Sequence, residues 1–282
     1  WYQDWSNASQ FGMMDINAFE ISEELCAMMG ISRSLFAKLV GSGWQVGAIS
    51  KKVAERTGLK EGMPVCTGGG DQQCAGVGAG VLTEGQCEVT FGTAGVSLAA
   101  INSPKRDPKA QVCLSAHAMP EKTWESEGLQ NAAASCYRWF RDNMAGMVKM
   151  VEPMMCVDPY EVLNHHAGTA PAGSKGVLFM PYLAGSACPN YNGLARGAFL
   201  GMSFNTDFGC LARSIMEGVA FEARTVLDAF NGFVDIKEIR MSGGATKSPL
   251  WSQIQADIYG RNTTSLEEGE CTVLGAAILG GF

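Results

Sequence analysis

The sequence predicts an α/β fold with a mixed sheet. Short apolar runs of strand character alternate with segments of helical spacing, and glycine-rich turns follow several of the expected strands. Segment 208–230 carries apolar residues every three to four positions, which predicts a long amphipathic helix. Hydrophobic residues make up 46% and charged residues 17% of the 282 residues, so the chain can build a sizeable core.

The first hundred residues predict short elements punctuated by glycine. Leu25, Met28, Met29, Leu35 and Leu39 have helical spacing within 20–40. In chain order, the next elements are a strand at 46–49, a helix that Ser50 caps and Gly58 ends, a buried strand at 63–67, an alanine- and glycine-rich helix at 72–80, and strands at 86–91 and 96–101.

The rest of the chain continues the alternation after a Pro/Lys/Asp-rich loop at 103–109. Asp207 is the expected N-cap of the long helix. The expected elements are a helix at 132–144, a strand at 176–183, the helix at 208–230, a strand at 236–241, a helix at 249–259 that begins with a proline, and a last helix from about 272. A change of texture at 81–85 is the candidate domain boundary.

Composition excludes several classes of protein. The net charge of -7 argues against nucleic acid as a partner, because a phosphate backbone needs a basic face. The apolar runs are too short to span a membrane. The ten cysteines form no CxxC pair and several lie in apolar segments, which predicts reduced thiols and a cytoplasmic location. The three histidines lack metal-ligand spacing, and no signal peptide is visible.

Both ends resemble cuts through a longer protein. The chain opens at Trp1 and not at a methionine, and its last residues, 276–282, stop inside an apolar pattern. We therefore expect a longer chain upstream and downstream.

Three glycine turns are the candidate sites of chemistry, because glycine lets a backbone approach a ligand closely and leaves N–H groups free for phosphate. The first, Gly68-Gly-Gly-Asp71, puts a carboxylate after a strand, where it can accept a proton from a substrate hydroxyl. Taken alone, such a four-residue stretch is more often a plain turn.

The other two turns suit phosphate or nucleotide. Gly92-Thr-Ala-Gly95 offers backbone amides and a hydroxyl, although the chain has no GxxxxGK[ST] phosphate loop. Ser242-Gly-Gly-Ala245 leads from a strand into a helix start, where the helix dipole favours an anion. Tight strand–helix packing is the alternative explanation of this turn.

The order and spacing of these motifs resemble the FGGY carbohydrate kinases. The matching stretches are collinear with the family over nearly the whole chain. They are Ser6-Asn-Ala-Ser9, Gly68-Gly-Gly-Asp71, Phe91-Gly-Thr-Ala-Gly95, Ala134-Ser-Cys-Tyr-Arg-Trp139, Met180-Pro-Tyr-Leu-Ala-Gly185, Ala195-Arg-Gly-Ala198, Met216-Glu-Gly-Val219, Ser242-Gly-Gly-Ala245 and Leu274-Gly-Ala-Ala277.

The resemblance implies a ribonuclease H-like, actin-like fold in two domains, with sugar and ATP meeting in the cleft between them. Residues 1–82 would be the last part of the first domain, which holds the sugar, and 83–282 most of the second, which holds the nucleotide. The roles it implies are catalytic base for Asp71, sugar contact for Gln72, and ATP contacts for Gly92, Thr93, Gly95, Ala134, Arg138, Gly243, Gly244, Ala245 and Ser248. Asp71 would also lie near the Mg²⁺ that accompanies ATP.

The chain departs from the family pattern in two places, and one motif of the family is missing. Gly185-Ser-Ala-Cys-Pro189 replaces the Gly-Glu-Arg-Thr-Pro of many xylulokinases, and Gln72 stands where xylulokinases commonly have asparagine and glycerol kinases glutamine. The other phosphate loop of the family, Asp-x-Gly-Thr, does not occur in this sequence.

The resemblance therefore implies an ATP-dependent kinase that phosphorylates a sugar or polyol, with a pentulose such as xylulose as the expected substrate. We expect the 282 residues alone to be inactive. The alternatives are an ATP or polyphosphate hydrolase of the same superfamily and a non-catalytic regulatory module that binds sugar or nucleotide. The expected partners are small molecules and not nucleic acid or membrane, and whether the protein forms a homodimer stays open.

Overall fold

The computed structural model describes residues 1–150, 156–266 and 269–281, and a six-stranded mixed sheet forms its centre. Strand order is β14–β13–β7–β8–β10–β9; the first three strands are parallel and the other pairs antiparallel. The strands are β7 (Gln86–Phe91), β8 (Gly95–Ile101), β9 (Cys113–Ala116), β10 (Trp124–Gln130), β13 (Glu238–Ser242) and β14 (Thr263–Ser265).

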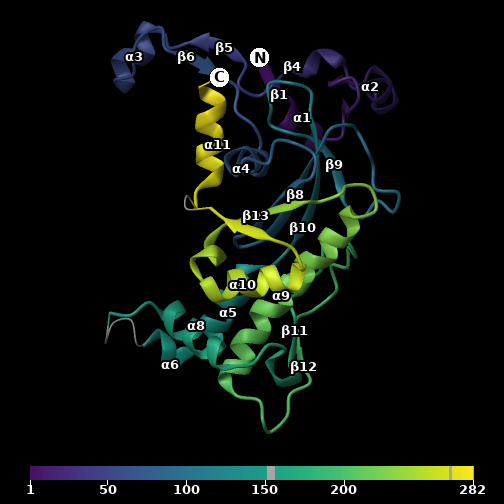
Figure 1. Cartoon of the computed structure of the whole chain (residues 1–282). Coiled ribbons are helices and arrows are strands. Elements are labelled where there is room, and N and C mark those ends of the chain that lie inside the picture. The colour runs from purple at the N-terminus through teal and green to yellow at the C-terminus, as the bar shows by residue number, and fades with distance from the viewer. Residues whose placement is uncertain (151–155, 267–268, 282) are drawn as a thin grey trace.

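Helices cover both faces of this sheet (Figure 1). They are α4 (Asp71–Gly78) and α11 (Cys271–Gly280) on one face, and α9 (Phe208–Phe230) and α10 (Pro249–Tyr259) on the other. Successive residues of β8 alternate between the two cores: Leu98 and Ala100 pack with α4, and Ala99 and Ile101 pack with α9. The whole of β8 is therefore buried.

The long helix α9 has the predicted bounds and cap. Asp207 accepts a hydrogen bond from the Cys210 backbone N–H at 2.9 Å, which satisfies one of the free donors at the helix start. Residues Ile215, Val219 and Ala223 are fully buried on the face that the periodicity predicts. The predicted α10 is also confirmed, with Pro249 at its first turn and Ser248 as its N-cap.

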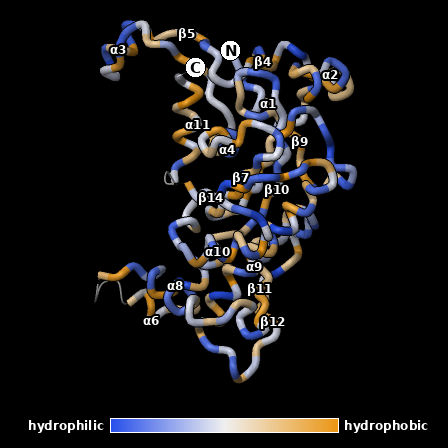
Figure 2. The backbone as a smooth tube through the Cα atoms, in the orientation of Figure 1, coloured by the Kyte–Doolittle hydropathy of each residue, from blue (hydrophilic) through white to orange (hydrophobic). Residues whose placement is uncertain are grey.

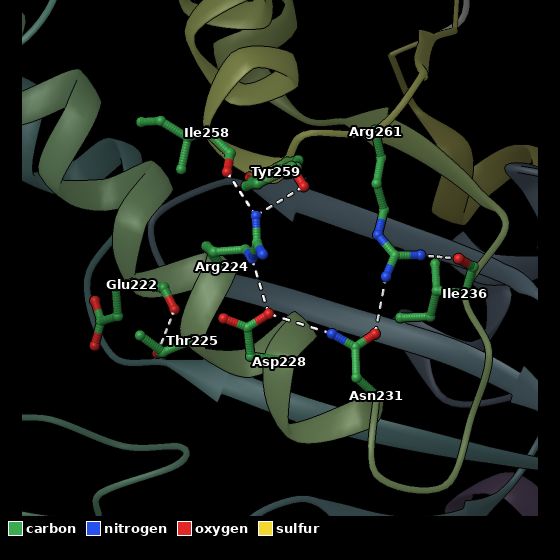
Figure 3. A network of polar contacts seen from close by, with 9 residues as sticks. All are labelled: Glu222, Arg224, Thr225, Asp228, Asn231, Ile236, Ile258, Tyr259 and Arg261. Carbon is green, nitrogen blue, oxygen red and sulfur yellow. Dashed lines mark hydrogen bonds and ion pairs between the residues drawn. The ribbon is translucent and has the colours of Figure 1, made fainter.

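Polar contacts fasten the ends of α9 and α10 together (Figure 3). Arg224 donates to the carbonyl oxygens of Ile258 and Tyr259, both at 2.9 Å, and forms an ion pair with Asp228. These bonds satisfy C-terminal carbonyls of α10 that have no partner within the helix. They fix the C-terminal end of α10 against α9.

Helices α4 and α11 cross with their backbones in close contact. A Cβ atom at Gly275 would overlap the carbonyl oxygen of Cys74, and one at Gly78 would overlap that of Cys271. Figure 2 shows α11 coloured apolar or neutral along most of its length. Glycine at the crossing lets α11, which ends the described chain, lie directly on the helix that Asp71 begins.

The remaining elements form two groups along the chain, one before α4 and one after β10. The first group contains β1 (Tyr2–Asp4), α1 (Trp5–Gln10), β2 (Met14–Asp15), β3 (Glu20–Ile21), α2 (Glu23–Met29), η1 (Arg33–Leu35), β4 (Lys38–Val40), β5 (Gln45–Ala48), α3 (Lys51–Thr57) and β6 (Pro64–Cys66). The second contains α5 (Ala134–Asn143), α6 (Gly146–Lys149), α8 (Pro159–Thr169), η2 (Ser174–Gly176), β11 (Leu178–Met180), β12 (Ala198–Leu200) and η3 (Gly244–Lys247).

Some local predictions were wrong. Helical structure within 20–40 ends at Met29 apart from one short turn, and Leu39 lies in β4, which pairs with β1. The strand at 63–67 forms but is not buried, since Val65 is 37% exposed. Strands β9 and β10 and helix α8 were not predicted. Among the described helices, none is both long enough and apolar enough to cross a membrane.

Candidate active site

Asp71 is the first residue of α4 and its side chain is exposed. The sequence predicts that this aspartate directly follows a strand. In the structure β6 ends at Cys66, and the glycine loop 68–70 separates it from the helix. The Asp71 Oδ1 atom accepts the N–H of Gln72 at 2.9 Å. The Asp71 carboxylate therefore lies exposed at the N-terminus of α4.

Strand β10 brings the carboxyl group of Glu127 near Asp71, with that of Glu125 beside Glu127. Gln73 donates from Nε2 to Glu125 at 2.6 Å and more weakly to Glu127 at 3.4 Å. Burial, and next the charge of Glu127, raise the pKa of Glu125 well above its ordinary value. Burial, and next the charge of Asp71, raise the pKa of Glu127. Asp71 is therefore within electrostatic reach of β10.

The second glycine turn joins β7 to β8 and is attached to the start of α5. Gly92 accepts a hydrogen bond from the Ala134 N–H, and Thr93 accepts one from the Ala133 N–H, both at 3.0 Å through backbone carbonyls. A Cβ atom at Gly95 would overlap the side-chain oxygen of Gln130, so a larger residue there would force that side chain to shift. The turn and the N-terminus of α5 therefore form one rigid corner.

The third glycine turn lies beside the second. Strands β13 and β7 are parallel and pair Ser242 with Thr90, so both strands end at the same edge of the sheet. Gly243 has φ of +83°, and a Cβ atom there would lie 2.7 Å from the carbonyl oxygen of Phe91. This position favours glycine for both its left-handed backbone and its close approach to β7.

Two adjoining cavities follow these turns and contain most of the predicted nucleotide residues. A cavity of about 160 Å³ is lined by Phe91, Gly92, Thr93, Ala134, Ser135, Arg138, Tyr160 and Gly244. A larger one of about 540 Å³ shares Ala134, Tyr160 and Gly244 with it, and Ala245 and Ser248 lie in its wall. Gly95 and Gly243 line neither cavity, although each belongs to one of the two turns beside them.

The register of the sheet gives the spacing between Glu127, which is within electrostatic reach of Asp71, and the end of the second glycine turn. Glu127 pairs with Leu98, and Gln130 pairs with Gly95, so three residues of β10 separate the two levels. At about 3.3 Å per residue this is roughly 10 Å along the strand.

Comparison with known proteins identifies the family. The N-terminal domain of the FGGY family of carbohydrate kinases matches residues 1–78, and the C-terminal domain of the same family matches residues 87–282. The chain belongs to the FGGY family of carbohydrate kinases.

Individual FGGY relatives differ in the substrate that their names give. The gluconokinase of Bacillus subtilis (strain 168) is 31% identical over 279 residues, which cover 98% of this chain and 54% of the relative. The xylulose kinase of the same organism is 30% identical over 282 residues, which cover 100% and 54%. The chain spans about half the length of the curated relatives it matches.

Solved structures of FGGY kinases show the same fold. A xyloylose kinase from Brucella ovis superposes with a TM-score of 0.85 at 28% identity, over 99% of this chain and 55% of that one. The glycerol kinase of Plasmodium falciparum, crystallised with ADP, gives 0.84 at 26% identity over 99% and 54%. The predicted ribonuclease H-like, actin-like fold is confirmed.

The FGGY motifs include Tyr137 but missed the other two aromatic residues in the wall of the larger cavity, Tyr160 and Trp251. The Tyr137 and Tyr160 rings stack with centroids 6.0 Å apart, and Trp251 meets Tyr137 edge-on at 5.3 Å. Tyr137 also donates from its hydroxyl to Asn164 at 3.2 Å. Tyr160 lies on α8, whose start could have been predicted from Asp158, the N-cap, followed by proline at the first helical position.

The residues described here include no group of three or more histidine, cysteine, aspartate or glutamate side chains arranged to hold a metal ion. Cys26, Cys74, Cys87 and Cys271 are buried, and the first three of them form no disulfide.

Proposed function

We propose that this chain takes part in the ATP-dependent phosphorylation of a sugar or polyol hydroxyl, with Asp71 as the general base. The observation that carries the proposal is the exposed carboxylate at the start of α4, a helix packed on the sheet whose β7–β8 turn forms a glycine corner with adjoining cavities. A carboxylate accepts the proton of the attacking hydroxyl, and the glycine corner suits the phosphates.

The two glycine turns would divide the nucleotide between them. Gly92, Thr93 and Gly95 form the corner for the transferred phosphate, next to the start of α5 with Ala134 and Arg138. The amide groups of Gly243, Gly244 and Ala245, with Ser248, would hold the remaining phosphates and the adenine. The 540 Å³ cavity beside Gly244 is large enough for a nucleobase and has an aromatic wall. We expect Mg²⁺ to arrive with ATP and to interact with Asp71 only indirectly.

In the proposed reaction Asp71 accepts the hydroxyl proton as the substrate oxygen attacks the γ-phosphorus in line. The bond to the bridging oxygen breaks, and ADP leaves. Water is a competing acceptor, so closure of the two domains over the substrates has to exclude it. We place the boundary of these domains near residue 82, between the two ranges that match the family.

The substrate that we propose is a neutral ketopentose such as xylulose, or a polyol. Glu127 lies within electrostatic reach of Asp71, and Glu125 is fully buried beyond it. The exposed carboxylate of Asp71 itself accepts a hydroxyl donor and repels a sugar acid. Because the chain spans about half the length of its relatives, we expect these 282 residues alone to phosphorylate no sugar.

The test uses the protein as its gene encodes it and measures ADP release against a panel of neutral sugars, polyols and sugar acids. We expect stimulation by a ketopentose or polyol, and a loss of 10²-fold or more in kcat for Asp71→Asn, the order that general-base catalysis contributes. Asp235→Asn, at an exposed aspartate outside the site, is the matched control. Steady ATP hydrolysis that no sugar stimulates would instead support a hydrolase, and an Asp71→Asn variant as fast as the parent would refute the base assignment.

A further inference from the structure

We propose that Ser6 and Asp4 are positioning residues that hold the glycine loop in front of Asp71. The Ser6 hydroxyl accepts a hydrogen bond from the Gly70 N–H at 2.8 Å and donates its own proton to Asp4 Oδ1. Gly70 is the N-cap of α4 and directly precedes Asp71. This inference rests on the proposed function, because it assigns these residues to the support of the proposed base.

The hydrogen bonds around Asp4 fix the direction of the Ser6 hydroxyl. Asp4 is 6% exposed, and its two oxygens also accept the backbone N–H of Asn7 at 3.0 Å and the side-chain amide of Asn7 at 2.9 Å. A hydroxyl group has one proton and two lone pairs. Since the proton of Ser6 is given to a carboxylate, the lone pairs are left for Gly70.

The loop needs an external support because it consists of three glycines, which have the greatest backbone freedom of any residue. Gly70 has no side chain with which to cap α4. Its Cα faces the side-chain oxygen of Gln73, and a Cβ atom there would overlap that oxygen. Ser6 therefore holds the loop on one side and Gln73 confines it on the other. Both contacts determine where Asp71, the next residue, lies.

The contact joins distant parts of the chain. Ser6 is the second residue of α1, where no carbonyl of the same helix lies one turn earlier, and its hydroxyl reaches a loop 64 residues away. Ser9, on the same helix, provides the contrast: it donates to the Ser6 carbonyl at 2.7 Å and accepts from Ala116 at 3.1 Å, away from the glycine loop.

Three variants of the protein as its gene encodes it test the role: Ser6→Ala, Ser6→Thr and the matched control Ser9→Ala. We expect Ser6→Ala to lower kcat at least tenfold with KM for ATP changed less than twofold, since a small misplacement of a reacting group is costly while nucleotide binding is untouched. Ser6→Thr keeps the hydroxyl and is expected to restore most of kcat. Ser9→Ala is expected to stay within about twofold of the parent.

Hydrogen–deuterium exchange of peptides covering 67–72 provides a readout that does not depend on activity. We expect faster exchange in Ser6→Ala than in the parent or Ser9→Ala, at equal thermal stability. Unchanged exchange in Ser6→Ala, or a kcat that matches the parent, overturns the positioning role. If the parent itself phosphorylates no sugar, the proposed function fails, and the exchange measurement alone then decides whether Ser6 holds the loop.

Discussion

Replacing Glu222 with glutamine measures what a buried carboxyl group costs this fold near neutral pH. Glu222 is 6% exposed on α9 and accepts a hydrogen bond from Gln130 at 3.3 Å. In Figure 3 its carboxylate points away from the guanidinium groups of Arg224 and Arg261. Burial raises its pKa to about 7, and the Gln130 bond opposes the shift only in part.

The magnitude follows from linkage between proton binding and folding. A carboxyl group with a pKa of about 7 in the folded chain and 4.5 in the unfolded chain contributes its full stabilisation below pH 4.5. That contribution is lost as the pH rises through 7, because the charged form must then be buried. The difference of about 2.5 pKa units corresponds to about 3 kcal/mol in total, of which about 2 to 3 kcal/mol is lost between pH 5 and 8.

The assay is denaturant unfolding of the parent and of Glu222→Gln at several pH values from 5 to 8. Glutamine is isosteric and can still accept the Gln130 hydrogen bond, so only the ionisation is removed. We expect the variant to gain about 2 to 3 kcal/mol on the parent between pH 5 and 8. Glu55→Gln, at an exposed glutamate on α3, should follow the parent throughout. Parallel stability curves for the parent and Glu222→Gln, within about 0.5 kcal/mol, would refute the reasoning.

Two glycine pairs test the close contacts of the backbone. Gly275→Ala should destabilise the protein by several kcal/mol, because its Cβ atom would overlap the Cys74 carbonyl oxygen. Its control is Gly280→Ala on the same helix, where a Cβ atom meets nothing within 4 Å. This variant should leave the stability unchanged or raise it by roughly 0.5 to 1 kcal/mol. Gly243→Ala should cost at least about 1 kcal/mol and weaken nucleotide binding, since it combines a positive φ with a contact of 2.7 Å to the end of β7. Gly244→Ala, which meets nothing within 4 Å, is its control for stability. Denaturant unfolding decides both pairs, and equal losses within a pair would contradict the steric argument.

Elements with strong local patterns were predictable from the sequence. The bounds of α9, α10 and β7 agree with prediction because each is specified by its own residues: the apolar period and the N-cap Asp207 for α9, Pro249 at the first turn of α10, and a short apolar run before a glycine turn for β7. The three glycine turns were also visible locally. Their roles as base and nucleotide residues came from the family resemblance and stay predictions.

Strand β10 shows why the rest was not predictable. Its glutamates at 125 and 127 and its glutamine at 130 have the composition of an exposed segment, yet Glu125 is fully buried. Helix α8 has a local start signal in Asp158 and Pro159, but the position of its Tyr160 depends on stacking on Tyr137 of another helix. In both cases the partner that stabilises the residue lies on another element.

The sequence by itself therefore determined the α/β class, the long helices and the glycine turns, because these depend on residues a few positions apart. Only the tertiary structure decided what surrounds Asp71. The bond from Gln73 to Glu125 joins residues 52 apart, and that from Gly70 to Ser6 joins residues 64 apart. Such contacts leave no periodicity in the chain, since their geometry exists only after the sheet and helices have packed.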